Sequence, residues 1–292
     1  MKLRIGSRGS QLAVWQANHI AGLLRGQGHE AEIEIIKTTG DRLHEVTFAE
    51  VGSKGMFTKE IEDALAEGRV DLAVHSLKDL PTELSEQFAL AATPRRVDPR
   101  DAFVSVKYGS LAELPRGARV GTSSQRRRAQ LMALRPDIEA VEFRGNVDTR
   151  LRKLAEGLVD GILLAAAGLE RLGKTEWVRE RMDPRDFCPA AGQGALGIET
   201  RKDDGETIAA IAFLDDAETR FAVTVERAAL AALGGGCQVP IGVYCRPSLE
   251  RPVAGESWVE IFAVVADPKT GSAVRVYHLA PRNETEPTAL GR

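Results

Sequence analysis

Residues 59–81 read KEIEDALAEGRVDLAVHSLKDLP, and this stretch decides the class of fold. Its first half has the spacing of an amphipathic helix, which Gly68 is expected to stop. A short apolar strand is predicted over 70–77, and the polar turn KDLP ends it. A helix that runs through a short turn into an apolar strand is typical of α/β domains with parallel strands.

The chain contains a second copy of this unit. Residues 65–71 read LAEGRVD and residues 154–160 read LAEGLVD, and an apolar strand follows each of them. The copies lie too far apart for a solenoid repeat, so they predict two α/β domains of similar construction. A shorter repeat begins at Asp98 (DPRDAF) and at Asp183 (DPRDFC), where prolines and charges suit segments that cross between the two domains.

Periodicity predicts the remaining elements. The second domain is expected to contain strands at 101–106, 118–122, 138–143 and 159–165 and helices at 124–135 and 146–156. From about residue 217 the pattern becomes a helix with a glycine stop, followed by strands at 241–246, 258–266 and 273–279. We therefore predict an α/β fold with three domains: residues 1–94 with 195–213, residues 100–190, and a small α+β domain at 217–292.

Composition excludes several classes of protein. The chain has 292 residues, 43% of them hydrophobic, and a formal net charge of -3, so any positive site must be local rather than a general nucleic-acid surface. No stretch approaches the roughly 20 apolar residues of a membrane span, and the N-terminus has no secretory signal pattern. The three cysteines lack CxxC spacing. We expect a cytoplasmic protein without a metal site.

Residues 121–128, GTSSQRRR, are predicted to run from a strand into a helix N-terminus. Backbone N–H groups, hydroxyls and the helix dipole make such a place a natural anion site. Forked guanidinium donors follow in the sequence, although consecutive helical residues cannot all face one way. They belong to Arg126, Arg127, Arg128, Arg144 and Arg150. Several arginines at the strand ends of one domain favour an anion with many charges.

The turn after strand 70–77 is expected to present His75, Lys78 and Asp79. Ligands of parallel α/β sheets bind beyond the carboxyl ends of the strands. A carboxylate beside a lysine can stay ionised, accept hydrogen bonds and stabilise a developing cation. A solvated turn with an ordinary surface ion pair explains the same pattern, so the residue types leave both interpretations open.

Three further signals are weaker. Arg8 and Ser10 repeat the strand-to-helix pattern near the N-terminus. Residues 50–60, EVGSKGMFTKE, fit a mobile lid whose Lys54 or Lys59 reaches an anion, and fit a plain loop equally well. They lack the spacing of a Walker loop.

Cys237 follows a glycine run at the end of a predicted helix. Such a loop lacks the burial of a structural cysteine, yet nothing nearby in the sequence lowers the thiol pKa. The position therefore permits a covalent attachment point, and it permits a small packing residue. Cys188 and Cys245 lie in apolar contexts and are expected in the core.

From residue 3 to about residue 246 the chain resembles the porphobilinogen deaminases (hydroxymethylbilane synthases). Nine segments occur in the order and with the spacing of that family. They are IGSRGSQLAVWQA, GSKGMFTKEIEDAL, VHSLKDLPT, RRVDPRDAFVS, GTSSQRRRAQL, FRGNVDTRLRKL, AAAGLERL, CPAAGQGALGIE and GGGCQVPIG.

The resemblance implies two periplasmic-binding-protein-like α/β domains around a cleft, plus a small third domain. It implies stepwise condensation of four porphobilinogen molecules into hydroxymethylbilane with release of ammonia, in tetrapyrrole and haem biosynthesis. The family's dipyrromethane cofactor would be covalently attached to Cys237. Asp79 matches the catalytic aspartate, which would assist loss of the aminomethyl nitrogen and hold pyrrole N–H groups.

The resemblance also assigns the carboxylate-binding positions. Those matching cofactor-binding positions are Lys78, Ser124, Arg126, Arg127, Arg144 and Arg150. Those matching substrate-binding positions are Arg8, Ser10 and, more weakly, Arg171. Gln125 replaces a common leucine and Glu45 a frequent aspartate, and the chain ends at Arg292, where relatives often continue a helix.

Two other classes compete with an enzyme. A carboxylate-binding protein of the same fold could capture its ligand without transforming it, and the arginine run could bind nucleic acid. The missing secretion signal and the loop cysteine argue against the first, and the acidic balance argues against the second. We expect a monomer that acts on porphobilinogen and binds neither nucleic acid nor membrane.

Overall fold

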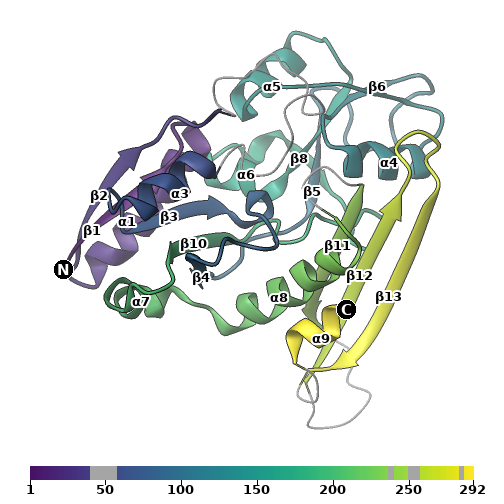
Figure 1. The fold of residues 1–292 in the computed structure, drawn as a ribbon. Helices are drawn as coiled ribbons and strands as arrows, with labels where there is room; N and C mark the ends of the chain where they lie inside the picture. The colour runs from purple at the N-terminus through teal and green to yellow at the C-terminus, as the bar shows by residue number, and fades with distance from the viewer. Residues whose placement is uncertain (40–57, 236–239, 249–256, 283–285) are drawn as a thin grey trace. The chain divides into compact units, whose positions relative to one another are not determined.

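The computed structural model describes the chain outside four segments, which are residues 40–57, 236–239, 249–256 and 283–285. The described residues divide into two compact units (Figure 1). Unit 1 consists of residues 1–97 and 195–220, and unit 2 of residues 98–194 and 221–292. The three-domain division stays a prediction, because this partition groups the C-terminal residues with the middle of the chain.

Unit 1 is built on a five-stranded sheet of order β2-β1-β3-β10-β4. Strands β1, β2 and β3 are parallel, whereas β10 is antiparallel to both β3 and β4. The strands are β1 (Lys2–Ser7), β2 (Glu30–Ile35), β3 (Leu72–Ser76), β4 (Phe88–Ala92) and β10 (Leu196–Arg201). The strands that follow the helix-to-strand connections are parallel, as those connections predict. Strand β10 is antiparallel because it enters the sheet where the chain returns from residues 98–194.

The helices of unit 1 cover its sheet with apolar faces. Helix α1 begins after Ser10, whose Oγ accepts a hydrogen bond from the Ala13 N–H at 3.3 Å. Buried residues of α1 pack on β1, β3 and β10, and those of α3 form a second apolar cluster. The elements are α1 (Gln11–Gly26), α3 (Lys59–Ala66), η1 (Leu77–Asp79), α7 (Gly205–Ile211) and η3 (Ala212–Leu214).

Unit 2 repeats the same sheet topology with order β7-β6-β8-β5-β9. Strand β6 is parallel to β7 and β8, and β5 is antiparallel to β8 and β9. The strands are β5 (Asp101–Val104), β6 (Arg119–Gly121), β7 (Glu139–Val141), β8 (Gly161–Ala165) and β9 (Val178–Arg181). Strands β6, β7, β8, β5 and β9 thus correspond to β1, β2, β3, β10 and β4, which confirms the prediction of two α/β domains of similar construction.

The repeated LAEG segments occupy equivalent places in the two units. Each ends a helix and leads into the third parallel strand, and Gly68 and Gly157 both adopt positive φ angles, of 69° and 79°. Only glycine takes this conformation without strain. The helices of this part of unit 2 are α4 (Gln125–Leu134), α5 (Val147–Ala155), α6 (Ala166–Arg171) and η2 (Thr175–Trp177).

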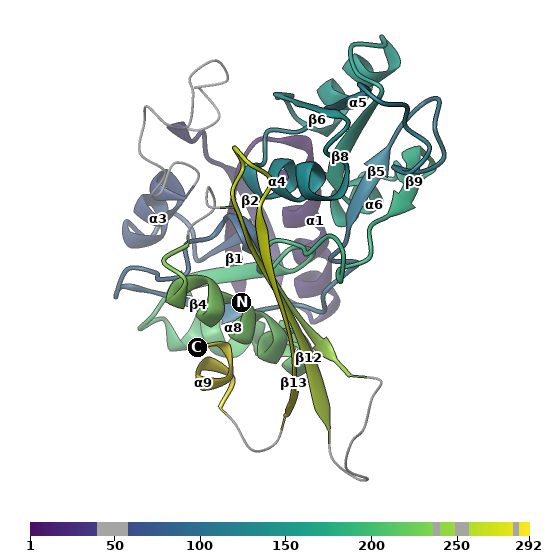
Figure 2. The ribbon, with the colours of Figure 1, turned by 90° about the vertical axis from the view of Figure 1, so that its right-hand side faces the viewer.

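The C-terminal part of unit 2 is an antiparallel sheet of order β11-β12-β13 with helix α8 against it. Its hairpin turns at residues 267–271 as the DPKTG motif predicts, and Figure 2 shows the hairpin reaching α4. The elements are α8 (Ala217–Ala232), β11 (Ile241–Pro247), β12 (Trp258–Ala266), β13 (Ala273–Pro281) and α9 (Pro287–Gly291). Cys188 and Cys245 are both buried, as the sequence predicts.

None of the helices in the described part of the chain combines the length and the apolar character needed to cross a membrane.

Gly161 gives a test of the packing between β8 and β5. A Cβ at this position would lie 2.4 Å from Cε2 of Phe103, a fully buried ring on β5. We expect Gly161→Ala to lower the free energy of unfolding by about 1–3 kcal/mol, because the closely packed ring cannot move aside. Gly22→Ala is the control, since a Cβ there meets no atom within 4 Å on the exposed side of α1.

The control should stabilise by about 0.5–1 kcal/mol through helix propensity. Urea unfolding of both variants measures the two effects. A Gly161→Ala variant as stable as the parent would show that β8 and β5 are not packed in this way.

Candidate functional site

In unit 1, polar residues follow two neighbouring parallel strands. The register that pairs Ile5 with Leu72 brings the carboxyl ends of β1 and β3 to the same edge of the sheet. Arg8 and Ser10 follow β1, and the turn η1 with Lys78 and Asp79 follows β3. Four of the residues predicted from the sequence therefore lie at one edge, where parallel α/β sheets bind ligands.

The turn that carries Asp79 is held by its backbone. The Leu77 N–H donates to the Ala195 carbonyl at 3.0 Å, and the Leu80 N–H donates to the Leu77 carbonyl at 3.1 Å. The Asp79 side chain is exposed and makes no hydrogen bond or ion pair with any residue in the described ranges. A fixed turn thus presents an unengaged carboxylate.

His75 does not belong to that turn, so the expectation that the loop presents it is wrong. It lies inside β3 with 7% of its surface exposed, and its Nε2 is 2.9 Å from Oε2 of Glu199, a fully buried residue of β10. Alternation along the strand points His75 to the face opposite that of Ser76, whose Oγ accepts a hydrogen bond from Gln16 Nε2 at 2.9 Å. The imidazole is engaged in the interior of the unit.

A third titratable group lies near this pair. Burial raises the pKa of Glu62 on α3, and the charge of Glu199 raises it further. The Oε1 atom of Glu199 is buried without a hydrogen-bond partner among the described residues. The sequence offered no signal for this cluster, because its members come from three distant segments.

In unit 2 the edge of the sheet that corresponds to the Asp79 edge of unit 1 includes the carboxyl end of β6. The Ser124 N–H donates to Thr122 Oγ1 at 3.2 Å, and Ser124 Oγ accepts from the Arg127 N–H at 3.4 Å, which caps α4. Ser124 thus has the place in unit 2 that Ser10 has in unit 1. Gln125, which departs from the family pattern, is exposed.

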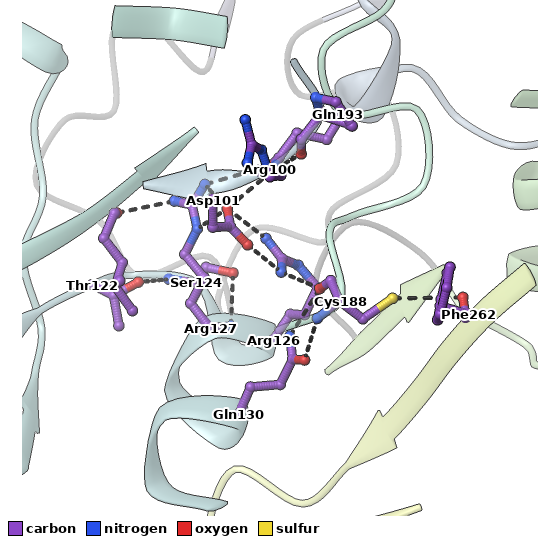
Figure 3. Close-up of polar contacts among 12 residues, drawn as sticks. Arg100, Asp101, Thr122, Ser124, Arg126, Arg127, Gln130, Cys188, Gln193 and Phe262 are labelled. Atoms are coloured by element: carbon purple, nitrogen blue, oxygen red, sulfur yellow. Dashed lines mark hydrogen bonds and ion pairs between the residues drawn. The ribbon is translucent and has the colours of Figure 1, made fainter. Parts of the chain in front are cut away.

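Two arginines of α4 share one carboxylate (Figure 3). Asp101 is fully buried; Arg126 NH1 donates to its Oδ2 at 2.7 Å and Arg127 Nε to its Oδ1 at 2.9 Å. Burial alone would raise the pKa of Asp101, but the charges of Arg126 and then Arg127 hold it well below its usual range. The cluster therefore contains an ionised acid at neutral pH.

The neighbours of Asp101 complete its hydrogen bonds. Gln193 Nε2 donates to Asp101 Oδ1 at 3.0 Å and to the Pro99 carbonyl at 2.7 Å. Gln130 and the Cys188 backbone exchange two hydrogen bonds, at 2.9 and 2.7 Å, as Figure 3 shows. Sequence reasoning missed these residues as a site, although Gln193 lies in the CPAAGQG motif and Asp101 in the DPRD repeat.

Arg150 and Arg171 differ from the two arginines of α4, since neither has an ion pair with a residue in the described ranges. Burial, and then the like charge of Arg127, lowers the pKa of Arg150 to about 10, and its buried Nε has no hydrogen-bond partner there. Burial also lowers the pKa of Arg171 to about 10, and its NH2 donates to the Gly194 carbonyl at 2.7 Å. Both remain protonated at neutral pH without an ion-pair partner in the part of the chain that the structure describes, which is the electrostatic condition for binding an anion.

The remaining predicted residues are scattered. Arg144 is partly exposed, with Nε 2.6 Å from Oε1 of Glu142, and Lys59 is exposed at the start of α3. Lys54, Cys237 and Glu45 lie outside the described residues. Within the described ranges, no group of three His, Cys, Asp or Glu side chains is placed to hold a metal ion.

Family models cover most of the chain. The model described as "Porphobilinogen deaminase, dipyromethane cofactor binding domain" matches residues 3–209. The model described as "Porphobilinogen deaminase, C-terminal domain" matches residues 220–292.

Relatives with curated names are similar over most of their length. The porphobilinogen deaminase of Nitratidesulfovibrio vulgaris (strain DSM 19637 / Miyazaki F) is 54% identical over 242 residues, which is 82% of this chain and 76% of the relative. That of Bordetella parapertussis (strain 12822) is 47% identical over 287 residues, 98% of this chain and 89% of the relative.

Solved structures include a methionine binding protein that matches 73% of this chain and 89% of its own, with 13% identity and a TM-score of 0.47. A likeness of this size does not favour a particular ligand.

Arg150 gives a test of the uncompensated charge. In a Cys237→Ala background, which lacks the thiol to which the family's cofactor would be attached, we expect Arg150→Met to raise the free energy of unfolding at pH 7 by about 1–3 kcal/mol, because burial disfavours the charged form and the methionine keeps the apolar stem. The group is protonated in both states below about pH 10, so the full effect applies at neutral pH. The variant should also lose most of the rise in melting temperature that added succinate produces in the Cys237→Ala background.

The matched control is Arg152→Met on the same helix, since Arg152 is exposed and paired with Glu156. Its stability should change by less than about 0.5 kcal/mol and its response to succinate should not change. Calorimetry with and without succinate measures both quantities. A destabilised Arg150→Met protein would contradict the interpretation of Arg150 as an uncompensated cation.

Proposed function

Because the chain belongs to the porphobilinogen deaminase family, we propose that it joins four porphobilinogen molecules into hydroxymethylbilane and releases ammonia. It is a transferase of tetrapyrrole biosynthesis, and dipyrromethane is its cofactor. Each pyrrole of cofactor and substrate carries acetate and propionate groups, so every elongation step adds two carboxylates. The site must therefore hold many negative charges.

Two arginines without an ion pair among the described residues, the half-buried Arg150 and the buried Arg171, are the observation that supports this function best. A buried guanidinium without a counter-ion is costly, and a ligand carboxylate removes that cost while gaining a charge-assisted hydrogen bond of about 1.5–3 kcal/mol. The buried Nε of Arg150, which lacks a partner among the described residues, is one donor that such a ligand would satisfy. The residues present thus fit a polycarboxylate cofactor.

The predicted site residues divide between the cofactor and the substrate. Cys237 anchors the cofactor covalently, and Lys54 and Lys59 belong to a lid. The carboxylates of the cofactor are held by Lys78, Ser124, Arg127, Arg144 and Arg150. Substrate carboxylates are held by Arg8, Ser10 and Arg171. Arg126 also matches a cofactor-binding position, but its guanidinium is already engaged by Asp101 and the Cys188 carbonyl.

Asp79 acts as the catalytic carboxylate. When bound, dipyrromethane supplies the pyrrole end on which the new chain is built. The exposed Asp79 carboxylate accepts hydrogen bonds from pyrrole N–H groups, and its negative charge stabilises the positive charge that develops as the amine leaves. The backbone bonds of Leu77 and Leu80 keep the carboxylate in place during the four rounds.

The wider setting follows the family and the charge balance. We propose a cytoplasmic monomer with three domains, at 1–94 with 195–213, 100–190 and 217–292. Nucleic acid is not a partner, because the net charge is -3 and the arginine cluster is largely buried. A carboxylate-binding protein without catalysis is the alternative, and ammonia release from porphobilinogen distinguishes it from the enzyme.

An intact mass of the purified chain tests the proposed function. We expect an excess equal to two linked porphobilinogen units on the parent and none on Cys237→Ala, because the cofactor is attached through that thiol. Ammonia release on adding porphobilinogen should follow the same pattern. If a chain with a bare mass gains no mass and releases no ammonia after incubation with porphobilinogen, the proposal is wrong.

Asp79→Asn tests the catalytic carboxylate. The substitution keeps the shape and removes the charge, so we expect kcat to fall by about 10²–10⁴-fold. Because the side chain is exposed and unengaged, the free energy of unfolding should change by less than about 0.5 kcal/mol. Steady-state rates and urea unfolding measure the two effects, with Glu83→Gln as a control for loss of a nearby charge. A normal kcat in Asp79→Asn would remove Asp79 from the mechanism.

A further inference from the structure

We propose that Asp101 is a fixed counter-ion for Arg126, so that the two shape the arginine cluster without adding net charge to it. The net positive charge that meets a ligand carboxylate then comes from the second cation on Asp101, Arg127, together with Arg150 and Arg171. This inference rests on the proposed function, because it concerns how the same site holds a polycarboxylate. It makes Asp101 and Arg126 positioning residues rather than ligand-binding ones.

The contacts of Arg126 are already made within the protein. Its NH1 donates to Asp101 Oδ2 at 2.7 Å and to the Cys188 carbonyl at 2.6 Å, which uses both hydrogens of that nitrogen. Its NH2 donates to Asp101 Oδ1 at 3.2 Å. Arg126 therefore forks both oxygens of one carboxylate, the geometry in which guanidinium and carboxylate compensate each other most fully. Its exposed fraction is 5%, close to the 6% of Arg127, so the two arginines differ in how they contact Asp101 and not in burial.

Arg127 stands differently towards the same carboxylate. It reaches only Oδ1 of Asp101, through Nε at 2.9 Å and NH2 at 2.8 Å. Its NH1 also donates to the Leu163 carbonyl at 3.2 Å and its NH2 to Gln193 Oε1 at 3.4 Å. The positive charge of Arg127 still lowers the pKa of Arg150, so Asp101 does not cancel the charge of Arg127 at that position. One acid cannot neutralise two cations, and the excess charge of the cluster lies towards Arg127 and Arg150.

Asp101 is suited to a permanent counter-ion. It is fully buried, its carboxylate receives hydrogen bonds from Arg126, Arg127 and Gln193, and its low pKa keeps it ionised throughout the neutral range. It begins β5, where the Met182 N–H donates to its carbonyl at 2.8 Å. Both the backbone and the side chain of Asp101 are thus fixed, so the acid defines where the two guanidinium groups lie.

The test is a charge cycle on the full chain in a Cys237→Ala background, with succinate as the probe. The variants are Asp101→Asn, Arg126→Met and the double variant, and calorimetry gives the dissociation constant of succinate. Arg126→Met leaves Asp101 short of a counter-ion, so we expect affinity to fall about 10-fold. Asp101→Asn adds net positive charge and should raise affinity. The double variant should return to within about 3-fold of the background.

A matched control comes from the same unit. Arg135 forks Asp137 through Nε and NH2, both at 2.8 Å, away from the cluster. The double variant Arg135→Met with Asp137→Asn should leave succinate affinity unchanged. Circular dichroism checks folding, and if a single variant does not fold, the double variant alone decides, because apolar or neutral groups often replace a buried ion pair without loss of stability.

Three results would overturn the inference. In the first, the double variant binds succinate about 10-fold more weakly than the background, which would mean that Arg126 binds the ligand directly. In the second, Asp101→Asn binds succinate with unchanged affinity. In the third, the background binds no succinate. Failure of the proposed function is detected separately, as absence of ammonia release from porphobilinogen by the unmodified chain. The charge cycle can therefore succeed or fail whatever the outcome of that assay.

Discussion

The carboxylate of Asp101 is the point on which the anion site of unit 2 depends. Two guanidinium groups and one amide converge on it in the protein interior, and it is fully buried. Without the acid, Arg126 and Arg127 would be two buried cations side by side, and their repulsion would drive α4 away from β5. With it, the N-terminus of α4 is held against the strand, and the cations farther along the site keep their positive charge.

This acid can occupy its place because of how the chain crosses between the units. In each sheet the fourth strand is antiparallel to its neighbours and comes from a segment that has just arrived from the other unit. Strand β5 carries Asp101 and strand β10 carries Glu199, each a fully buried acid facing a basic side chain of its own unit. The crossing strands thus complete both sheets and supply a buried carboxyl group to each.

Local patterns in the sequence were sufficient for the parts of the fold that depend on near neighbours. The glycine-stopped helices before β3 and β8, the serine cap of α4 and the DPKTG turn all follow from residues within one turn of each other. The antiparallel entry of β10 and β5 was not predictable in this way, because strand direction depends on a distant partner, 120 residues away for Leu196 of β10 and 64 residues away for Asp101 of β5. The misplacement of His75 has the same origin: its partner Glu199 is far along the chain.

In the candidate site, too, contacts between residues far apart in the sequence could not be predicted from local patterns. Helical geometry predicted only that Arg126, Arg127 and Arg128 cannot all face one way. Which of them has a counter-ion was not predictable, since Asp101 lies 25 and 26 residues before Arg126 and Arg127. The difference matters chemically. A compensated guanidinium gives shape, whereas an uncompensated one, such as Arg150 with its lowered pKa, is under electrostatic strain that a carboxylate ligand relieves. Sequence shows where arginines gather, and only their partners in three dimensions show which of them are ready to bind.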